Sequence, residues 1–233
     1  MKVLVACEES QRVCQAFRDK GHEAYSADIL DCSGGHPEWH IKGDVLKIIN
    51  PDTNCSPDGA NVWSSIDFNT MDGVHHQIDR WDLMICHPPC TYLTTTGNRW
   101  FNVEKYGDKA RERMKLREEA YDFFLALANA DCDKIVIENP IGYMNTHWRK
   151  PDQIIQPYWF GEPFEKRTCL WLKGVQPLVA TDMVTPEERT QFASGKSMPA
   201  WYCEAAKLPP AERSKVRSKT FWGIARAMAD QWG

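Results

Sequence analysis

One cysteine in this sequence stands in a tightly constrained setting. The stretch ICHPPCTY (85–92) carries Cys90 directly after two prolines, at the end of an apolar run that begins at Trp81. Pro88 and Pro89 fix their own φ angles and restrict the residues before them, so they would hold the thiol in one position. A thiol that loses its proton near positive charge is a nucleophile for covalent catalysis. Cys90 is therefore a candidate catalytic residue.

A carboxyl group that could assist this thiol follows 48 residues later. Glu138 closes the apolar segment KIVIENP (134–140) and precedes Asn139. Burial at a strand end would raise the pKa of Glu138 and leave it protonated enough to donate to a substrate atom. The alternative for either residue is a structural role, Cys90 as packing and Glu138 as a cap.

The N-terminal turn CEESQ offers a second chemistry. It lacks the glycines of a dinucleotide-binding turn, and its two acids would repel a pyrophosphate. The same acids suit a ligand that is cationic at this point, such as the ammonium and sulfonium of S-adenosylmethionine. Asp28 could accept hydrogen bonds from ribose hydroxyls and Asp44 from an adenine amine. These residues favour a nucleoside cofactor, although each could instead be a helix-start or turn acid.

The elements that would position these groups alternate along the chain. Apolar runs at 2–7, 23–29, 81–86, 134–140 and 167–174 predict strands, and segments 11–20, 108–130 and the last part of 211–232 predict helices. This order indicates an α/β fold with a mainly parallel sheet and helices on both faces. Ligands gather at the carboxyl ends of such strands, where the thiol and acids above are expected. Residues 31–80 are the least regular part.

Several segments in a fixed order give the chain a family resemblance. DLMICHPPCTYLTTTGNRWF, IVIENP and FEKRTCLWLKG resemble the DNA (cytosine-5)-methyltransferase family. Pro89–Cys90 matches its Pro-Cys nucleophile motif, Glu138–Asn139 its Glu-Asn motif, and Arg167 its basic motif at the next strand. The closing segment RSKTFWGIARAMADQW resembles the last helix of that family. The match covers most of residues 1–233 and implies one Rossmann-like, S-adenosylmethionine-dependent methyltransferase domain.

The resemblance implies a site of three parts. The thiolate of Cys90 would add to carbon 6 of cytosine, Glu138 would protonate ring nitrogen 3, and Arg167 would bind the base carbonyl or steady Glu138. A target base inside a duplex would be out of reach and would have to be flipped out; whether the DNA is single- or double-stranded stays open. The implied cofactor-binding residues are Cys7, Glu8, Glu9, Asp28, Ile29, Asp44, Val45 and Pro88. The implied substrate-binding residues are Pro89, Thr94, Arg99 and Asn139.

The chain departs from the family at three points: the glycine-free first turn, His87 before Pro-Pro-Cys, and Thr91 after Cys90. Residues 175–212 also form only a minimal insert where the family has a target-recognition domain. Sequence selectivity is therefore expected to be low or supplied by a protein partner. Such short forms resemble those of bacteriophages and imply self-protection or interference with a host restriction–modification system.

Bulk properties agree with a protein of the cytoplasm of a bacterium or a phage-infected cell. The 233 residues are 42% hydrophobic, and no apolar run is long enough to span a membrane. The N-terminal apolar run before Glu8 has only six residues, which is too short for a signal peptide. The nine cysteines are expected to be reduced. Residues 1–90 carry 7 basic and 14 acidic side chains, whereas the remainder carries 21 and 18. The basic second half is either a set of solvated helix faces or a phosphate-facing surface.

Three other interpretations remain open. A catalytically impaired methyltransferase-like protein could bind DNA or a host partner. A zinc site could use Cys32, His36 and His40, with Cys55, His75 or His76, but the glycines and proline between them argue against a shared helix face. Amino-group methylation needs Asp or Asn before Pro-Pro, where His87 stands.

Overall fold

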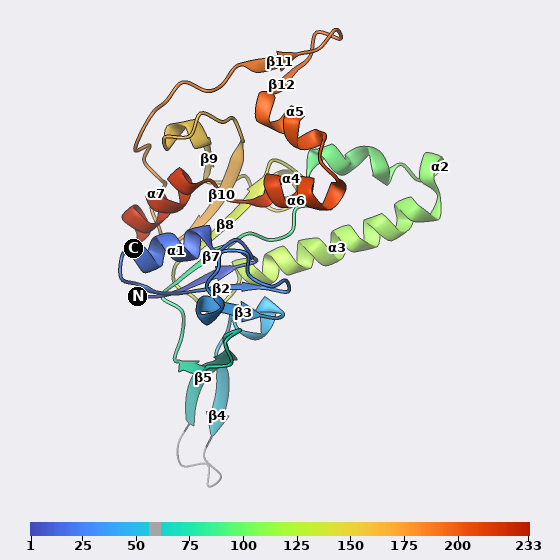
Figure 1. The fold of residues 1–233 in the computed structure, drawn as a ribbon. Helices are drawn as coiled ribbons and strands as arrows, with labels where there is room; N and C mark the ends of the chain where they lie inside the picture. The colour runs from blue at the N-terminus through green and yellow to red at the C-terminus, as the bar shows by residue number, and fades with distance from the viewer. Residues whose placement is uncertain (56–61) are drawn as a thin grey trace.

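A seven-stranded sheet forms the centre of the structure, a computed structural model that describes residues 1–55 and 62–233 (Figure 1). The strand order is β3-β2-β1-β7-β8-β10-β9. The first five strands of this order are parallel, and β10 is antiparallel to both of its neighbours. The strands are β1 (Lys2–Ala6), β2 (Glu23–Asp28), β3 (His40–Lys42), β7 (Leu83–Cys86), β8 (Ile135–Pro140), β9 (Gln153–Ile155) and β10 (Thr168–Lys173).

Helices cover both faces of this sheet, because successive side chains of a strand point to opposite faces and both sets are apolar. Val3 and Val5 pack with α1 (Arg12–Asp19) and α7 (Trp222–Trp232) on one face. Leu4 and Ala6 face the other side, where Phe124 of α3 (Asp108–Ala128) lies. The fold is thus α/β and compatible with a Rossmann-like architecture, as expected.

The remaining elements lie around this core. A three-stranded sheet, β4-β5-β6, projects from one end, and the β11-β12 hairpin projects from the opposite end (Figure 1). These elements are β4 (Asp52–Cys55), β5 (Val62–Asn69), β6 (His75–Ile78), β11 (Arg189–Gln191), β12 (Ser197–Pro199), α2 (Val103–Tyr106), α4 (Met144–His147), α5 (Ala200–Ala206) and α6 (Pro210–Ser218). The short 3₁₀ helices are η1 (Pro37–Trp39), η2 (Val45–Lys47), η3 (Thr95–Phe101) and η4 (Pro157–Trp159).

The predicted strands and helices are confirmed within a few residues at their ends. In region 31–80, which the sequence indicated as the least regular part, the structure has β3 and the small sheet, for which no prediction was made. The insert 175–212 folds as the β11-β12 hairpin with α5 and the start of α6. Among the described residues, no helix is long and apolar enough to cross a membrane.

The chain reverses its direction across the sheet between β1 and β7. From β1 it proceeds through β2 to β3 on one side, and β7 and β8 continue on the other side. The loops that follow β1 and β7 therefore lead to opposite sides of the sheet. The carboxyl ends of the strands at such a reversal are where open α/β sheets bind ligands.

Candidate functional site

Sheet register brings the two predicted catalytic segments together. Cys86 pairs with Ile137 across the parallel strands β7 and β8, so the next residues, His87 and Glu138, are neighbours. The Asn139 amide donates a hydrogen bond of 2.8 Å to the carbonyl oxygen of Pro88, and both residues are buried. The segment that carries Cys90 is thereby fixed to the strand end that carries Glu138. Asn139, predicted to bind substrate, has this structural role.

A buried ion pair occupies the strand ends. His87 Nδ1 lies 2.6 Å from Glu138 Oε2, and the side chains are only 10% and 9% exposed. Burial opposes the charged form of His87, but the Glu138 carboxylate outweighs it and raises the pKa of His87. His87 Nε2 is buried and has no partner among the described residues. Sequence reasoning noted His87 only as a departure from the family and did not predict this pair.

The protonation expected for Glu138 is corrected by this geometry. Burial alone would raise the pKa of Glu138, as predicted, but Lys166 and the His87 hydrogen bond together hold it below its ordinary value. Both shifts favour the form of the pair with an imidazolium and a carboxylate. A proton for a substrate atom would come from His87 through Glu138.

The cation beside this carboxylate is Lys166, whereas the sequence predicted Arg167. Leu170 of β10 pairs with Glu138, so their side chains share one face of the sheet. Counting back by twos along the extended chain puts Lys166 on that face and Arg167 on the other. Arg167 is exposed, and Lys166 is half-buried and acts on the charges of both Glu138 and Cys90. The sequence could not show this difference between Lys166 and Arg167, because it depends on the register of β10 against β8.

Cys90 is a half-buried free thiol at this site. Burial raises its pKa, with a further rise from Glu138 and an opposing effect of Lys166. These electrostatic effects place Cys90 near both charged groups, as the proposed chemistry requires. The low thiol pKa expected from the sequence is not found, so Cys90 is a thiol at neutral pH and would lose its proton only when it reacts. Pro89 beside it is exposed.

The segment after Cys90 is fixed at both ends. Thr94 N donates to Cys90 O at 3.0 Å, and Thr94 forms an isolated bridge with Gly142, which follows β8. A Cβ on Gly142 would lie 1.9 Å from the carbonyl oxygen of Leu93, so only glycine permits this approach. The loops that carry the predicted nucleophile and acid are thus joined a second time.

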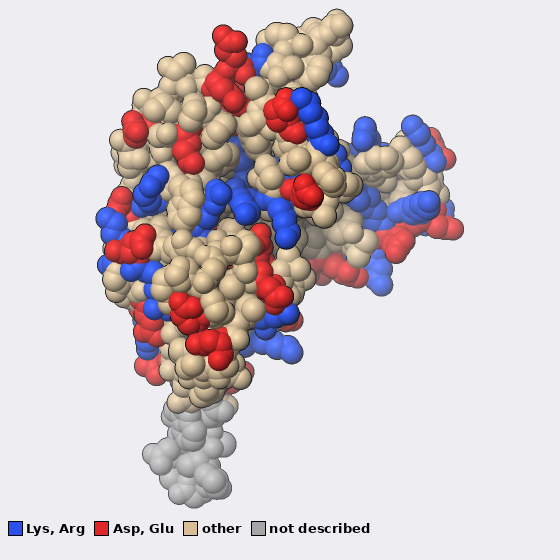
Figure 2. Space-filling view, in the orientation of Figure 1, with Lys and Arg blue, Asp and Glu red and all other residues tan. Residues whose placement is uncertain are grey.

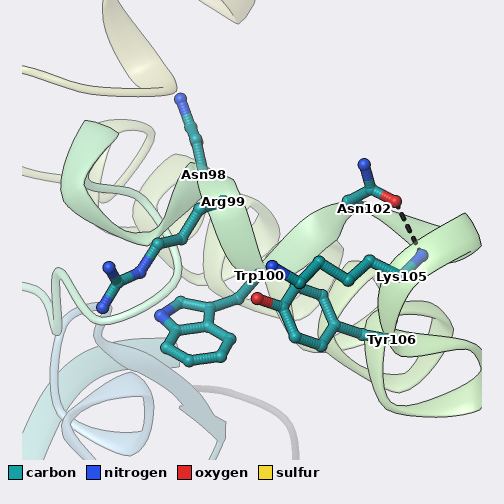
Figure 3. Close-up of a pocket in the computed structure, with 6 residues that line it drawn as sticks. All are labelled: Asn98, Arg99, Trp100, Asn102, Lys105 and Tyr106. Carbon is teal, nitrogen blue, oxygen red and sulfur yellow. Dashed lines mark hydrogen bonds between the residues drawn. The ribbon is translucent and has the colours of Figure 1, made fainter.

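Two arginines of α3 hold the next turn, η3. Arg113 donates to Thr91 O at 3.0 Å, and Arg117 donates to Tyr92 O at 2.9 Å and to Asn98 Oδ1 at 2.8 Å. The Arg117 guanidinium also lies 3.3 Å from the centroid of the Phe101 ring. Arg99, predicted to bind substrate, is exposed on this turn and lines an open pocket (Figure 3).

At the first turn, Glu8 has a structural role instead of the predicted cofactor contact. It is 4% exposed and accepts hydrogen bonds from Val13 N at 2.7 Å and Cys14 N at 3.1 Å. Its carboxylate therefore satisfies the free N–H groups at the start of α1. Burial raises the pKa of Glu8 in spite of these bonds. An anionic ligand could not use this helix end.

The other predicted cofactor residues lie around Cys7. Burial raises the pKa of Cys7 to about 12, and Asp28 and Asp44 add to this rise. Burial also raises the pKa of Asp28, and Glu9 contributes. Three carboxyl groups therefore lie near the end of β1 and give this end of the sheet a negative potential. This charge fits a cationic ligand, and the acids could hold its ammonium and hydroxyl groups.

The three apolar residues among the predicted cofactor contacts differ in exposure. Ile29 is 72% exposed directly after Asp28, whereas Val45 is buried after Asp44. The exposed Ile29 could contact a flat ring, but Val45 could contribute only as support from beneath. Pro88 is also buried, and its carbonyl group is engaged by Asn139.

The zinc interpretation does not agree with the side-chain contacts. Both ring nitrogens of His40 are occupied, by Ser26 Oγ at 2.8 Å and by Leu30 O at 2.9 Å. His36 stacks on Trp39 and contacts Glu38 at 2.9 Å. No group of three metal-ligating side chains converges in the part of the chain that the structure describes, and the Cys55 side chain lies outside that part.

Lys and Arg side chains line a hollow at the centre of the face shown in Figure 2. Contacts bring basic residues together between α1, β10 and α6: Arg12 donates to Thr220 O at 2.8 Å, and Lys166 Nζ lies 3.5 Å from Lys219 O. Neither Arg12 nor Lys166 has a salt bridge with a described carboxylate, although Lys166 acts on the charge of Glu138. Basic side chains from both halves of the sequence thus lie near Glu138.

No protein-family model matches the chain, and a search of curated proteins found no match either.

Proposed function

We propose that the protein methylates carbon 5 of cytosine in DNA, with Cys90 as the nucleophile and S-adenosylmethionine as the methyl donor. The observation that carries this proposal is the hydrogen bond of 2.8 Å from Asn139 to Pro88, which joins the Pro-Cys and Glu-Asn segments at neighbouring strand ends. Two motifs that lie 48 residues apart in the sequence form one site. The sheet, whose strand order reverses between β1 and β7, supports the finer assignment to a Rossmann-like methyltransferase fold.

The reaction requires a temporary covalent bond, because carbon 5 of cytosine is a weak nucleophile. Sulfur of Cys90 adds to carbon 6 as its proton leaves to solvent, and ring nitrogen 3 becomes basic as electron density moves onto the ring. Glu138 delivers a proton to that nitrogen and receives one from His87. Carbon 5 then takes the methyl group as the bond between that group and the donor sulfur breaks. The proton of carbon 5 leaves to solvent, the C–S bond breaks to release the Cys90 thiolate, which takes up a proton from solvent, and the proton on nitrogen 3 returns through Glu138 to His87.

The negative charge near the end of β1 supports the role of the cofactor. S-adenosylmethionine, when bound, supplies a methyl group on a positively charged sulfur. Asp28, Asp44 and Glu9 attract that charge. The Glu8 carboxylate is not available, because it accepts hydrogen bonds at the start of α1. Asp28 is the residue expected to bind the ribose hydroxyls, and Ile29 the adenine ring.

DNA as the substrate is supported by basic side chains near the site. Arg12 and Lys166 present positive charge there and form no salt bridge with a described carboxylate. Such charge attracts a phosphate backbone, and the surrounding aromatic rings of Trp222 and Phe221 already bind cations from this set. The small insert 175–212 supports low sequence selectivity or a partner protein.

The test is adduct formation on DNA that contains 5-fluorocytosine, in which the proton that must leave is replaced by fluorine. The protein is incubated with this DNA and tritiated S-adenosylmethionine, and covalent complexes are separated under denaturing conditions. We expect a radioactive adduct with the wild type, none with Cys90→Ser, and an undiminished adduct with Cys203→Ser, another half-buried thiol. Methyl transfer by Cys90→Ser would disprove the mechanism.

A second candidate function is binding without catalysis. It is favoured by the raised pKa of Cys90, because a thiol that stays protonated is a poor nucleophile. In that case the protein would bind DNA or a host partner, and neither adduct nor methylated DNA would form at any cofactor concentration.

A further inference from the structure

An open pocket with an unusual set of side chains lies on the turn that follows the proposed nucleophile. Its volume is about 530 Å³. We call it the loop pocket; it is lined by Asn98, Arg99, Trp100, Asn102, Lys105 and Tyr106 (Figure 3). The set has two cations, two amides and two aromatic rings, and no carboxylate. This composition suits a ligand that has both a flat ring and negative charge.

The aromatic rings form an accessible platform. Trp100 is 42% exposed, and its ring centroid lies 5.1 Å from that of Tyr106 at an angle of 47°. In Figure 3 the two rings lie side by side. When a flat ring covers an exposed tryptophan, the apolar ring surface is removed from water and free energy is gained. A ligand with a flat apolar face would therefore be stabilised here.

Positive charge flanks both rings. The Arg99 guanidinium lies 4.7 Å from the centroid of Trp100, and Lys105 Nζ lies 5.4 Å from the centroid of Tyr106. Neither cation forms an ion pair with a described carboxylate. Each is thus free to bind an anion next to the ring that it covers, and a guanidinium plane can itself stack on a base.

The amides at the rim are hydrogen-bond donors. Asn98 Oδ1 accepts from Arg117 at 2.8 Å, and Asn102 Oδ1 accepts from Lys105 N at 2.8 Å. Because both oxygens are occupied, the NH₂ groups are the parts left to meet a ligand. Donors match the ring nitrogens and carbonyl oxygens of nucleobases.

The turn that bears these groups is tied to α3. Arg117 donates to Asn98 Oδ1 at 2.8 Å, and Gly97 packs so closely that an added Cβ would lie 3.0 Å from Arg113. The same two arginines hold the residues just before the turn. Asn98 is only eight residues beyond Cys90. A preformed platform of this kind reduces the entropy that binding would otherwise cost.

We propose that the loop pocket binds an unpaired nucleotide of single-stranded DNA, with the base against Trp100 and Arg99 and the phosphate near Lys105. A base in a duplex hides both faces in the stack, so only an unpaired base can reach the Trp100 ring. The inference rests on the proposed function in one respect, that the same strand carries the cytosine attacked by Cys90. It assigns single-stranded DNA as the preferred substrate.

The experiment measures binding by fluorescence anisotropy with a labelled 15-nucleotide strand, with the duplex of that strand, and with deoxycytidine monophosphate as a competitor. We expect the wild type to bind the single strand more tightly than the duplex. Trp100→Leu, which keeps apolar bulk without a ring, should weaken single-strand binding about tenfold or more and leave duplex binding unchanged. Trp100→Phe should retain most of the affinity.

The matched control for charge is Arg111 of α3. Arg99→Ala and Arg111→Ala each remove one exposed cation from this region, but Arg111 is paired with Asp108 and does not line the pocket. We expect Arg99→Ala to weaken single-strand binding several-fold more than Arg111→Ala does. Competition by the free nucleotide at concentrations similar to those of the strand would instead identify a mononucleotide site and overturn the proposal.

The inference is wrong if Trp100→Leu and Arg99→Ala bind the single strand as the wild type does, or if both lose affinity equally for strand and duplex. Adduct formation with 5-fluorocytosine, measured on the same proteins, separates this failure from failure of the proposed function. Adducts that do not depend on Trp100 would refute only the pocket. Strand binding that depends on Trp100 without any adduct would refute only the methyl transfer.

Discussion

The buried pair of His87 and Glu138 allows a quantitative test. In His87→Leu, Glu138 loses the hydrogen bond of 2.6 Å and retains only Lys166 as a nearby cation. Removing one partner of a buried ion pair costs about 3–5 kcal/mol, since the other charge remains without its partner. Both side chains are about nine-tenths buried, so little screening by solvent reduces this value. We expect a loss of about 3 kcal/mol near pH 6, which corresponds to about 6–12 °C in Tm for a chain of this size.

The cost of His87→Leu should depend on pH in a defined way. The pKa of His87 is raised above 6.5, so its ionic contribution is complete below pH 6.5 and is lost as the pH rises through the higher value in the folded protein. The pKa of Glu138 is lowered from 4.5, so its contribution is complete above pH 4.5 and is lost as the pH falls through the lower folded value. The greatest difference from the wild type is therefore expected between pH 4.5 and 6.5.

Urea unfolding followed by tryptophan fluorescence measures both effects. The double variant His87→Leu, Glu138→Leu is the control, because replacement of a whole buried pair by apolar side chains is often neutral. It should recover most of the lost stability and show no pH dependence from this pair. A cost below about 1 kcal/mol for His87→Leu, equal at pH 6 and pH 9, would show that the pair is not ionic and refute the reasoning.

Three further predictions concern the joined loops. Gly142→Ala should force the Thr94 segment away from β8, because the new Cβ would lie 1.9 Å from Leu93 O; limited proteolysis should then cut the loop after Cys90 faster than in the wild type. Asn139→Ala leaves the buried Pro88 carbonyl without its donor and should cost about 1–3 kcal/mol in urea unfolding. Alkylation of Cys90 by iodoacetamide, followed by mass spectrometry, should be slow at pH 7.5 and rise about tenfold per pH unit, since its pKa is raised; rapid alkylation at pH 7 would contradict this.

The elements that could be predicted from the sequence are those with a strong local pattern. The apolar runs of β1, β7 and β8 identify buried strands, and the long helix α3 also has a local signal. The three residues of β9 and the polar, alternating β4-β5-β6 sheet were missed because short or half-exposed strands lack such a signal.

The candidate site was predictable only in part, for a different reason. Cys90 and Glu138 have motif neighbours, so sequence alone singled them out. The pairing of His87 with Glu138 depends on which residues of β7 and β8 lie side by side, and the structural role of Glu8 depends on the bend at Cys7, where φ is 61°. One signal was present: His87 and Glu138 each follow the last apolar residue of a strand.

The alternation that selects Lys166 over Arg167 has a consequence for how this site can change. Only residues an even number of positions from Leu170 point toward Glu138 along the extended chain. An insertion of one residue between Arg167 and Thr168 would thus exchange the two cations, with a planar guanidinium in place of an ammonium beside the acid. A change of two residues would preserve the parity and the charge. Length variation in this connection is therefore constrained in steps of two.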